Sequence, residues 1–397
     1  MLTTIQRRIA RDIIVMFCTS LFVITFLVMC IGVLGEAMNQ GLGFTGLFRL
    51  IPYALPNALS LAVPGTALFS VCCVYGRMSS DNEFTAMQAV GISIMPAVWP
   101  AIILTSLLSI ATVTLINVAF TWGFHGIQKV VFSSVENIAY GVLRQEHRFQ
   151  RDQFSLQVLD VDGKNLIEPS ITITRTGASP ISINARSAVL RYDDLTESIE
   201  FSITNGRADV GEQASFTFPD TFTQRIPLNS AADYNLLTAN PSHMPMRDLP
   251  SASMQQKDAI AKLEHEIAVS VGFNLLVSRP EETFGPTALA RNKALNSNRD
   301  RLHRLGTEMH RRWASGFTCL AMSMLGIPLA IRMKASDSMT TFGVVFLPTI
   351  LIYYPIFALT LDLAKDGHLA SEGVWIANLL FISASIVLIR KLAYKAA

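Results

Sequence analysis

Long apolar stretches without charged side chains recur six times along the chain, three within the first 125 residues and three after residue 312. An α-helix needs about 20 apolar residues to cross the ~30 Å hydrocarbon core of a bilayer. Most of the stretches reach or approach this length. The last is the shortest, with 17 uncharged residues between Glu372 and Arg390. The pattern therefore predicts six transmembrane helices, near 13–35, 51–76, 97–121, 313–332, 340–361 and 373–390.

The first stretch, between Asp12 and Glu36, has a competing interpretation as a cleaved signal peptide. A signal peptide has an apolar core of about 7–15 residues that is followed by a cleavage site of small residues. The 23 uncharged residues here exceed that length, and no such site follows them. We therefore expect a membrane helix.

The basic residues beside the stretches predict the orientation. Short cytoplasmic loops are enriched in Lys and Arg. Basic residues cluster before the first stretch and after the fourth and sixth, whereas the loop after the fifth is net acidic. Both termini are therefore predicted to be cytoplasmic, and the long segment between the third and fourth stretches is predicted to face outward.

Residues 150–228 of that segment follow the pattern of antiparallel β-structure. Short runs such as FSLQV (154–158) alternate apolar with polar side chains and recur about every ten residues. Turn signals separate them at Asp162-Gly163, Thr176-Gly177 and Asn205-Gly206, and Asn-Gly between alternating runs is a strong hairpin signal. Many short, evenly spaced strands predict an antiparallel sandwich.

The remainder of the segment predicts a linker and two helices. Residues 229–250 contain Pro, Asn and Ser and are expected to form a linker. Residues 253–276 have apolar side chains at helical spacing, and the charged residues 288–312 are expected to continue without a break into the fourth membrane helix. The predicted domains are 1–121 (three membrane helices), 122–312 (β part 150–228, linker and helical part 229–312) and 313–397 (three membrane helices).

Composition sharpens this division. Residues 122–312 carry 21 Lys and Arg and 22 Asp and Glu, about 23% of 191 positions, whereas the other 206 positions carry 11 and 8, about 9%. Soluble proteins carry about 25%. The net charge of +2 implies no nucleic-acid partner. All five cysteines lie in the apolar stretches, so neither a disulfide framework nor a Cys-x-x-Cys metal site is expected.

Several kinds of chemistry are absent from the sequence. It contains no GxxxxGK[S/T] phosphate loop and no GxSxG or HExxH motif. The centres of the apolar stretches lack the ionisable residues that ion-coupled transporters use as relays, which disfavours a secondary transporter. If this chain moves a substrate, the energy is expected to come from another protein.

The loop RMSSDNEFTAMQAVGIS (77–93), which is predicted to be cytoplasmic, reads as a short amphipathic helix. Ser80 and Glu83 fit a capping box at its start, and Gly91 is expected to end it. Phe84, Met87 and Val90 would then share one face. Helices that lie on lipid are usually basic, so the acidic residues of this loop favour docking into a groove of a soluble protein.

A basic cluster precedes the fourth apolar stretch and includes Arg304, Arg311 and Arg312. One interpretation is a solvated helix face with pairs between Arg304 and Glu308 and between Glu308 and Arg312. The other is a site for phosphorylated head groups, which arginine binds with forked geometry. The residues alone favour the solvated face.

Three segments carry a resemblance to a known family. SSDNEFTAMQAVGIS (79–93) resembles the coupling-helix segment of the lipopolysaccharide export permeases of the LptF/LptG type, and EMHRRWASGFTCLAMSMLGIPLAIR (308–332) resembles the start of their fourth span. Residues 185–206 are similar to part of their outward domain. The likeness covers nearly the whole chain, and residues 76–83 lean toward the LptF-like subunit. It implies a six-helix membrane protein with a periplasmic β-jelly-roll-like domain inserted between helices 3 and 4.

The resemblance also implies a function and partners. The chain would be the permease subunit of an ATP-driven ABC-type exporter that extracts lipopolysaccharide, or a related glycolipid, from the bacterial inner membrane. It would pair with a second homologous permease and pass the lipid to a periplasmic jelly-roll bridge of the LptC/LptA kind. An LptB-like cytoplasmic ATPase dimer would bind ATP and Mg, so no cofactor is expected on this chain and no enzymatic activity.

The resemblance implies roles for particular segments and residues. The first, second and fifth spans would line the lipid cavity, and the loop would transmit the motion of the ATPase. The implied coupling residues are Arg77, Asp81, Glu83, Phe84, Met87 and Gly91.

The sequence departs from the family at the outer end of the first span. Family members often carry basic residues there to meet lipid phosphates, whereas GVLGEAMNQG (32–41) has Glu36 and no Lys or Arg. This departure shifts the expectation to basic residues elsewhere. The candidate head-group residues are Arg49, Arg304, Arg311 and Arg312.

An alternative function stays open from the sequence. A membrane-anchored envelope scaffold or sensor, with a β domain that binds a ligand, would explain the insertion. It would not explain six spans, several of them with prolines, or an acidic docking helix.

Overall fold

The computed structural model describes most of the chain, and contacts within it define two compact units. A helical unit comprises Met1–Gly32, Pro52–Phe124 and Asn235–Ala397, and a β unit comprises Val33–Ile51 and His125–Tyr234. The described residues are 4–40, 44–130, 140, 143–144, 147–151, 154–173, 181–193, 198–210, 214–227, 236–278, 281, 284–333 and 338–394.

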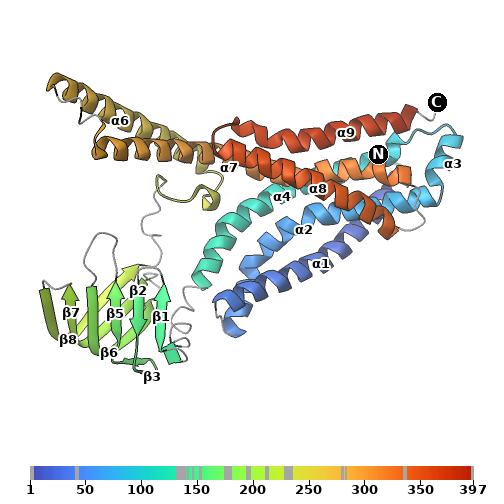
Figure 1. Cartoon of the computed structure of the whole chain (residues 1–397). Coiled ribbons are helices and arrows are strands. Elements are labelled where there is room, and N and C mark those ends of the chain that lie inside the picture. The colour runs from blue at the N-terminus through green and yellow to red at the C-terminus, as the bar shows by residue number, and fades with distance from the viewer. Residues whose placement is uncertain are drawn as a thin grey trace. The chain divides into compact units, whose positions relative to one another are not determined.

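The structure confirms the six predicted spans, since six of the described helices are long and apolar enough to cross a membrane. They are labelled in Figure 1. Their bounds are α1 (Thr4–Gln40), α2 (Phe44–Ser80), α4 (Met95–Val118), α7 (Pro286–Met333), α8 (Ser338–Lys365) and α9 (Ile376–Tyr394).

Helix α7 lies at the centre of the helical unit. Two glycines allow its neighbours to approach closely: a Cβ atom on Gly316 would lie 3.0 Å from the backbone oxygen of Ser109 on α4, and one on Gly326 would lie 3.4 Å from Cys72 Sγ on α2. Small residues at helix crossings are typical of membrane proteins. In contrast, only 17% of the apolar window of α1 and 22% of that of α8 is buried, so both helices present apolar side chains outward.

Buried polar groups tie α7 to its neighbours. The Thr318 and Tyr353 hydroxyls lie 2.6 Å apart, and the Tyr353 hydroxyl donates to Asn378 Oδ1 at 2.6 Å. Asn378 Nδ2 in turn donates to the backbone oxygen of Ala314 at 2.9 Å. Polar groups without partners are costly in a bilayer, so this chain of bonds fixes the register of α7, α8 and α9.

The β unit contains one connected antiparallel sheet of eight described strands. Strand β6 is central, because it pairs with β7 along its length and with β5 and β4 on its other edge; β8 pairs with β7. The inserted antiparallel β domain is therefore confirmed. The strands are β1 (Arg148–Arg151), β2 (Phe154–Gln157), β3 (Asp160–Asp162), β4 (Asn165–Ile167), β5 (Ser170–Ile173), β6 (Ile181–Asp193), β7 (Ser198–Val210) and β8 (Ala214–Pro227).

Of the turns predicted in the β unit, one is confirmed and another is wrong. Asp162-Gly163 does form the β3–β4 turn, with Gly163 at φ +60°. Asn205-Gly206 is not a hairpin turn: it lies inside β7, where the pairing with β8 shifts register between Thr204 and Gly206. A bulge uses the same left-handed conformation as a turn, here Asn205 at φ 53°, which explains the misleading signal. Thr176-Gly177 lies outside the described residues.

The described part of the linker and the helical part belong to the helical unit, which resumes at Asn235. The predicted amphipathic helix begins earlier than expected, as α6 (Leu249–Leu276), with Pro250 in its first turn. The charged helix runs into the fourth span without a break, as predicted. Gln256 of α6 is fully buried and donates to Asn298 Oδ1 of α7 at 2.6 Å, which pairs the two helices.

Candidate functional site

The helix predicted in the loop at 77–93 exists as α3 (Glu83–Ala89), but it starts differently. The expected capping box does not form: Ser80 is still part of α2, where its hydroxyl donates to the backbone oxygen of Arg77 at 2.8 Å. The turn into α3 is made by Asn82 in the left-handed conformation, at φ 56°. Asparagine tolerates this conformation better than most residues, so the break between α2 and α3 is encoded one residue before Glu83.

Gly91 ends α3, as predicted. It has φ +76°, and its amide donates to the backbone oxygen of Gln88 at 2.9 Å while the amide of Ile92 donates to that of Met87 at 2.9 Å. These two bonds form a Schellman motif, which satisfies the last carbonyls of a helix and requires a left-handed residue. The position therefore favours glycine for a conformational reason.

The apolar side chains of α3 do not all face the same way. Phe84 is 5% exposed, stacks on Tyr75 of α2 with ring centroids 6.2 Å apart, and belongs to the buried cluster of the bundle; Met87 packs against that cluster. Val90 is 77% exposed. The inward face thus anchors α3 on its own chain. The exposed side chains of this segment are those of Asp81, Asn82, Thr85, Ala86, Ala89 and Val90.

Two ion pairs connect this region with α1. Arg77 Nη2 lies 3.0 Å from Asp12 Oδ2, and Arg8 Nη2 lies 3.4 Å from Glu83 Oε1. All four side chains are at least partly exposed, so each pair contributes little to stability, about 0–1 kcal/mol. Their effect is geometric: α3 contacts α2 through Phe84 and α1 through Glu83.

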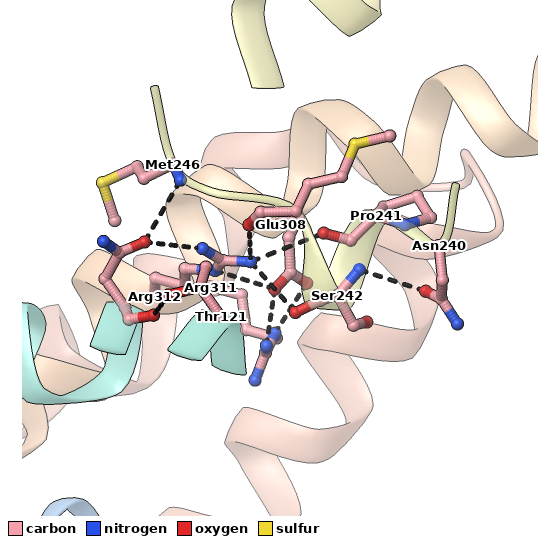
Figure 2. Close-up of polar contacts among 10 residues, drawn as sticks. Thr121, Asn240, Pro241, Ser242, Met246, Glu308, Arg311 and Arg312 are labelled. Atoms are coloured by element: carbon pink, nitrogen blue, oxygen red, sulfur yellow. Dashed lines mark hydrogen bonds and ion pairs between the residues drawn. The ribbon is translucent and has the colours of Figure 1, made fainter. Parts of the chain in front are cut away.

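The second candidate site is the basic cluster on α7, where Arg312 is fully buried. Its guanidinium donates to Glu308 Oε1 at 3.0 Å and to Asn117 Oδ1 of α4 at 2.9 Å. It also donates to the backbone oxygens of Ser242 at 3.0 Å and Met244 at 2.7 Å (Figure 2). These partners leave the guanidinium no exposed surface for a lipid phosphate, so the predicted head-group role does not fit Arg312 in this conformation.

Arg312 instead holds a segment of chain, residues 236–246, against α7; we call this segment the strap. Arg301, eleven residues and three helical turns earlier, donates to the backbone oxygens of Leu236 at 3.1 Å and Ala239 at 2.6 Å. The strap is shaped by the short helix η3 (Pro241–His243), where Asn240 Oδ1 accepts from the amide of Ser242 at 3.1 Å. Arg301 and Arg312 are therefore structural ties that hold the strap on α7.

Arg311 has a different environment. Its Nη2 lies 2.6 Å from Glu308 Oε1 and its Nε 2.8 Å from Oε2, and its guanidinium carbon lies 4.7 Å from the centre of the Phe120 ring. The predicted pair of Glu308 with Arg312 is confirmed, but Arg311 rather than Arg304 is the second partner. One carboxylate thus serves two guanidinium groups, which leaves the cluster with a net positive charge.

Arg311 borders a cavity of about 220 Å³ between α2, α4, α7 and α8. The wall as described is mostly apolar, with hydroxyl and amide groups at intervals, and Arg311 supplies its charge. At the α4 end, the π-helix η1 (Ala119–Gly123) turns Phe120 toward it; such bulges are frequent at functional sites. The lining residues are Asn57, Ser60, Leu61, Pro64, Ile116, Phe120, Arg311, Ser315, Thr318, Tyr353, Tyr354 and Phe357.

The other two head-group candidates are not among the residues that line this cavity. Arg304 is exposed and lines a wider polar pocket of about 830 Å³ beside the strap, together with Arg301, Lys365 and three aspartates. Arg49 is exposed and belongs to the β unit. Within the helical unit, Arg311 and Arg312 share the ion pairs with Glu308.

Sequence reasoning missed Asn117, which accepts from both Arg312 and the amide of Met246 at 3.1 Å. It also missed Tyr353 and Asn378. The sequence did contain a signal for these residues: each is a polar side chain within an apolar stretch, and such a side chain requires a hydrogen-bond partner. The sequence does not say which partner it has.

A family model describes the chain nearly from end to end. The model is that of the lipopolysaccharide export system permease LptF/LptG, and it matches residues 7–391. The chain belongs to this family. A comparison with curated proteins finds no match. The family model covers both subunit types, so the LptF-like assignment stays a prediction.

Membership of the LptF/LptG family fixes the general role. The chain is a lipopolysaccharide export permease, a membrane component of the export complex that it forms with other Lpt proteins. The six apolar helices agree with an inner-membrane protein. The two candidate sites are therefore sites of a permease.

Proposed function

We propose that this chain is the permease subunit of an ABC-type exporter that uses ATP hydrolysed on a separate cytoplasmic ATPase chain. It extracts lipopolysaccharide from the inner membrane and passes it to a periplasmic jelly-roll bridge. The observation that carries this proposal is the construction of α3, a helix anchored on the bundle by one face while its opposite face stays open. Both termini and α3 are cytoplasmic in this account, and the β unit is periplasmic.

The coupling proposal follows from the two faces of α3. The exposed face presents small or acidic side chains, including Asp81, Ala86 and Ala89, to a groove on the ATPase. Phe84 and Met87 transmit displacement because they are packed into the bundle, and Glu83 does so through Arg8 of α1. A movement of the ATPase that pushes α3 thereby shifts α2 and α1.

The lipid proposal follows from the outer surface of the bundle. Helices α1 and α8 expose most of their apolar windows, as expected of helices that meet lipid or a second homologous permease. The cavity beside Arg311, which lies between α2, α4, α7 and α8, combines an apolar wall with residual positive charge at its rim. A lipid phosphate would compete with Glu308 for Arg311 while acyl chains occupy the apolar wall.

Co-purification with the ATPase tests the coupling proposal. Replacing exposed Ala86 with arginine adds bulk and positive charge to the open face without disturbing Phe84. We expect the variant to insert and fold normally but to lose most of the ATPase from the purified complex. Ala261→Arg, at an exposed alanine of α6, is the matched control and keeps the ATPase. Normal ATPase content in the Ala86→Arg complex would contradict the proposal.

A further inference from the structure

A second cavity lies between α7 and α9, at the ends of the two helices that the orientation prediction places on the cytoplasmic side. Its volume is about 760 Å³. Apolar residues such as Leu329, Val387 and Leu388 form one part of the wall, and three basic residues form the other: Arg332, Arg390 and Lys391. Together they place a cluster of positive charge beside an apolar surface.

The junction of the two helices at this cavity is fixed by backbone chemistry. Pro328 of α7 has no amide hydrogen, so the backbone oxygen of Met324, one turn earlier, lacks its helical donor. The Ser385 hydroxyl of α9 supplies that donor at 2.5 Å. On the other side of α7, the Ser79 hydroxyl of α2 donates to the backbone oxygen of Ile331 at 2.7 Å. The cavity therefore has a preformed frame.

The three basic side chains are exposed, so their charges can contact a ligand in the cavity. The ion pairs among the described residues join none of the three to a carboxylate, whereas Arg8 and Arg11, near the N-terminus, pair with Glu83 and Asp12. Positive potential at the cavity is thus left uncompensated within the described chain. An anionic ligand would neutralise it.

We infer that this cavity binds an anionic phospholipid of the cytoplasmic leaflet, of the phosphatidylglycerol class. Its phosphate contacts Arg332 and Arg390, which offer forked donors, with Lys391 beside them. An acyl chain lies along Val387, which is 52% exposed, and Leu388. A lipid fits better than a soluble anion because the basic and apolar surfaces adjoin, and basic pockets between membrane helices on the cytoplasmic side are typical sites for acidic head groups. The site does not depend on what the protein exports.

Native mass spectrometry of the detergent-solubilised full-length protein, titrated with phosphatidylglycerol or with phosphatidylethanolamine of the same acyl chains, tests this inference. The wild-type protein is expected to retain phosphatidylglycerol selectively. Affinity should fall about fivefold for each removed cation, so Arg332→Gln with Arg390→Gln should weaken binding about 25-fold. The matched control, Arg7→Gln with Arg11→Gln, removes two arginines from the other basic cluster and should change the affinity less than about twofold.

Two further experiments distinguish the contribution of the apolar wall from that of the three basic residues. Val387→Trp fills the apolar half and keeps all three cations, and it should also abolish selective retention. Excess glycerol 1-phosphate should not displace the lipid, because it lacks the acyl chain. Equal losses in both double variants, full displacement by glycerol 1-phosphate, or a pocket variant that keeps the lipid but loses a partner protein would each overturn the inference.

Discussion

Replacing Arg312 with methionine removes a guanidinium that the helical unit holds fully buried, while keeping much of the side-chain volume. The variant leaves Glu308, whose side chain is 4% exposed, with Arg311 as its remaining ion-pair partner. It also removes a donor from the backbone oxygens of Ser242 and Met244 in the strap. The change therefore breaks a buried ion pair and, at the same time, releases one end of the strap.

The expected cost is large. Arg311 still pairs with Glu308 in this variant, so the carboxylate is not left without a cation. Most of the cost comes from the backbone oxygens of Ser242 and Met244, which lose their donor at about 1–3 kcal/mol for each unpaired group. A cost of about 4 kcal/mol raises the equilibrium constant for local opening of the strap nearly a thousandfold. Arg312→Lys keeps the charge but offers one donor group, so its effect should be intermediate.

Hydrogen–deuterium exchange of the strap amides, measured on the solubilised full-length protein, reads out this opening. In the Arg312→Met variant, amides such as that of Met246, which donates to Asn117, should exchange about a thousand times faster than in the wild type. Arg304→Met is the matched control on the same helix and should leave the strap protected. Unchanged strap exchange in Arg312→Met would refute the assignment of Arg312 as a tie.

Three substitutions test other contacts. Gly91→Ala should destabilise α3 by about 1–2 kcal/mol, because it forces an L side chain into the left-handed region; faster amide exchange in α3 would report this, and wild-type exchange would contradict it. Gly316→Val should separate α4 from α7 at Ser109 and lower the melting temperature in detergent, and an unchanged melting temperature would mean that the crossing is looser than described. Ser385→Ala should cost about 1 kcal/mol by depriving the Met324 oxygen of its donor; a variant as stable as wild type would show that this bond is dispensable.

The sequence predicted those features that depend on composition or on a few adjacent residues. The six spans follow from long charge-free stretches, and the end of α3 follows from Gly91, because a Schellman motif needs a left-handed residue at one position. The capping box at Ser80 was wrong because α2 continues through that residue. Asn205-Gly206 was wrong because the pairing of two long strands overrides a local turn signal.

The candidate sites were only partly predictable, because their decisive contacts are distant in the chain. Arg312 meets Met244, 68 residues earlier, and Asn117, 195 residues earlier. No local pattern distinguishes such a buried tie from a solvated arginine or a phosphate site. Likewise, the helical spacing of Phe84 and Met87 indicated a shared face, but not that this face packs on Tyr75 of the same chain.

ATP-dependent release of lipopolysaccharide from proteoliposomes tests the central claim most directly. The complex of this chain with its partner permease and ATPase would be reconstituted with lipopolysaccharide, and transfer to a soluble jelly-roll acceptor would be followed with and without ATP. The account predicts ATP-dependent transfer by the wild type and by Ala261→Arg, and loss of most transfer in Ala86→Arg on the open face of α3. Equal transfer by Ala86→Arg and the wild type, or transfer that does not require ATP, would contradict it.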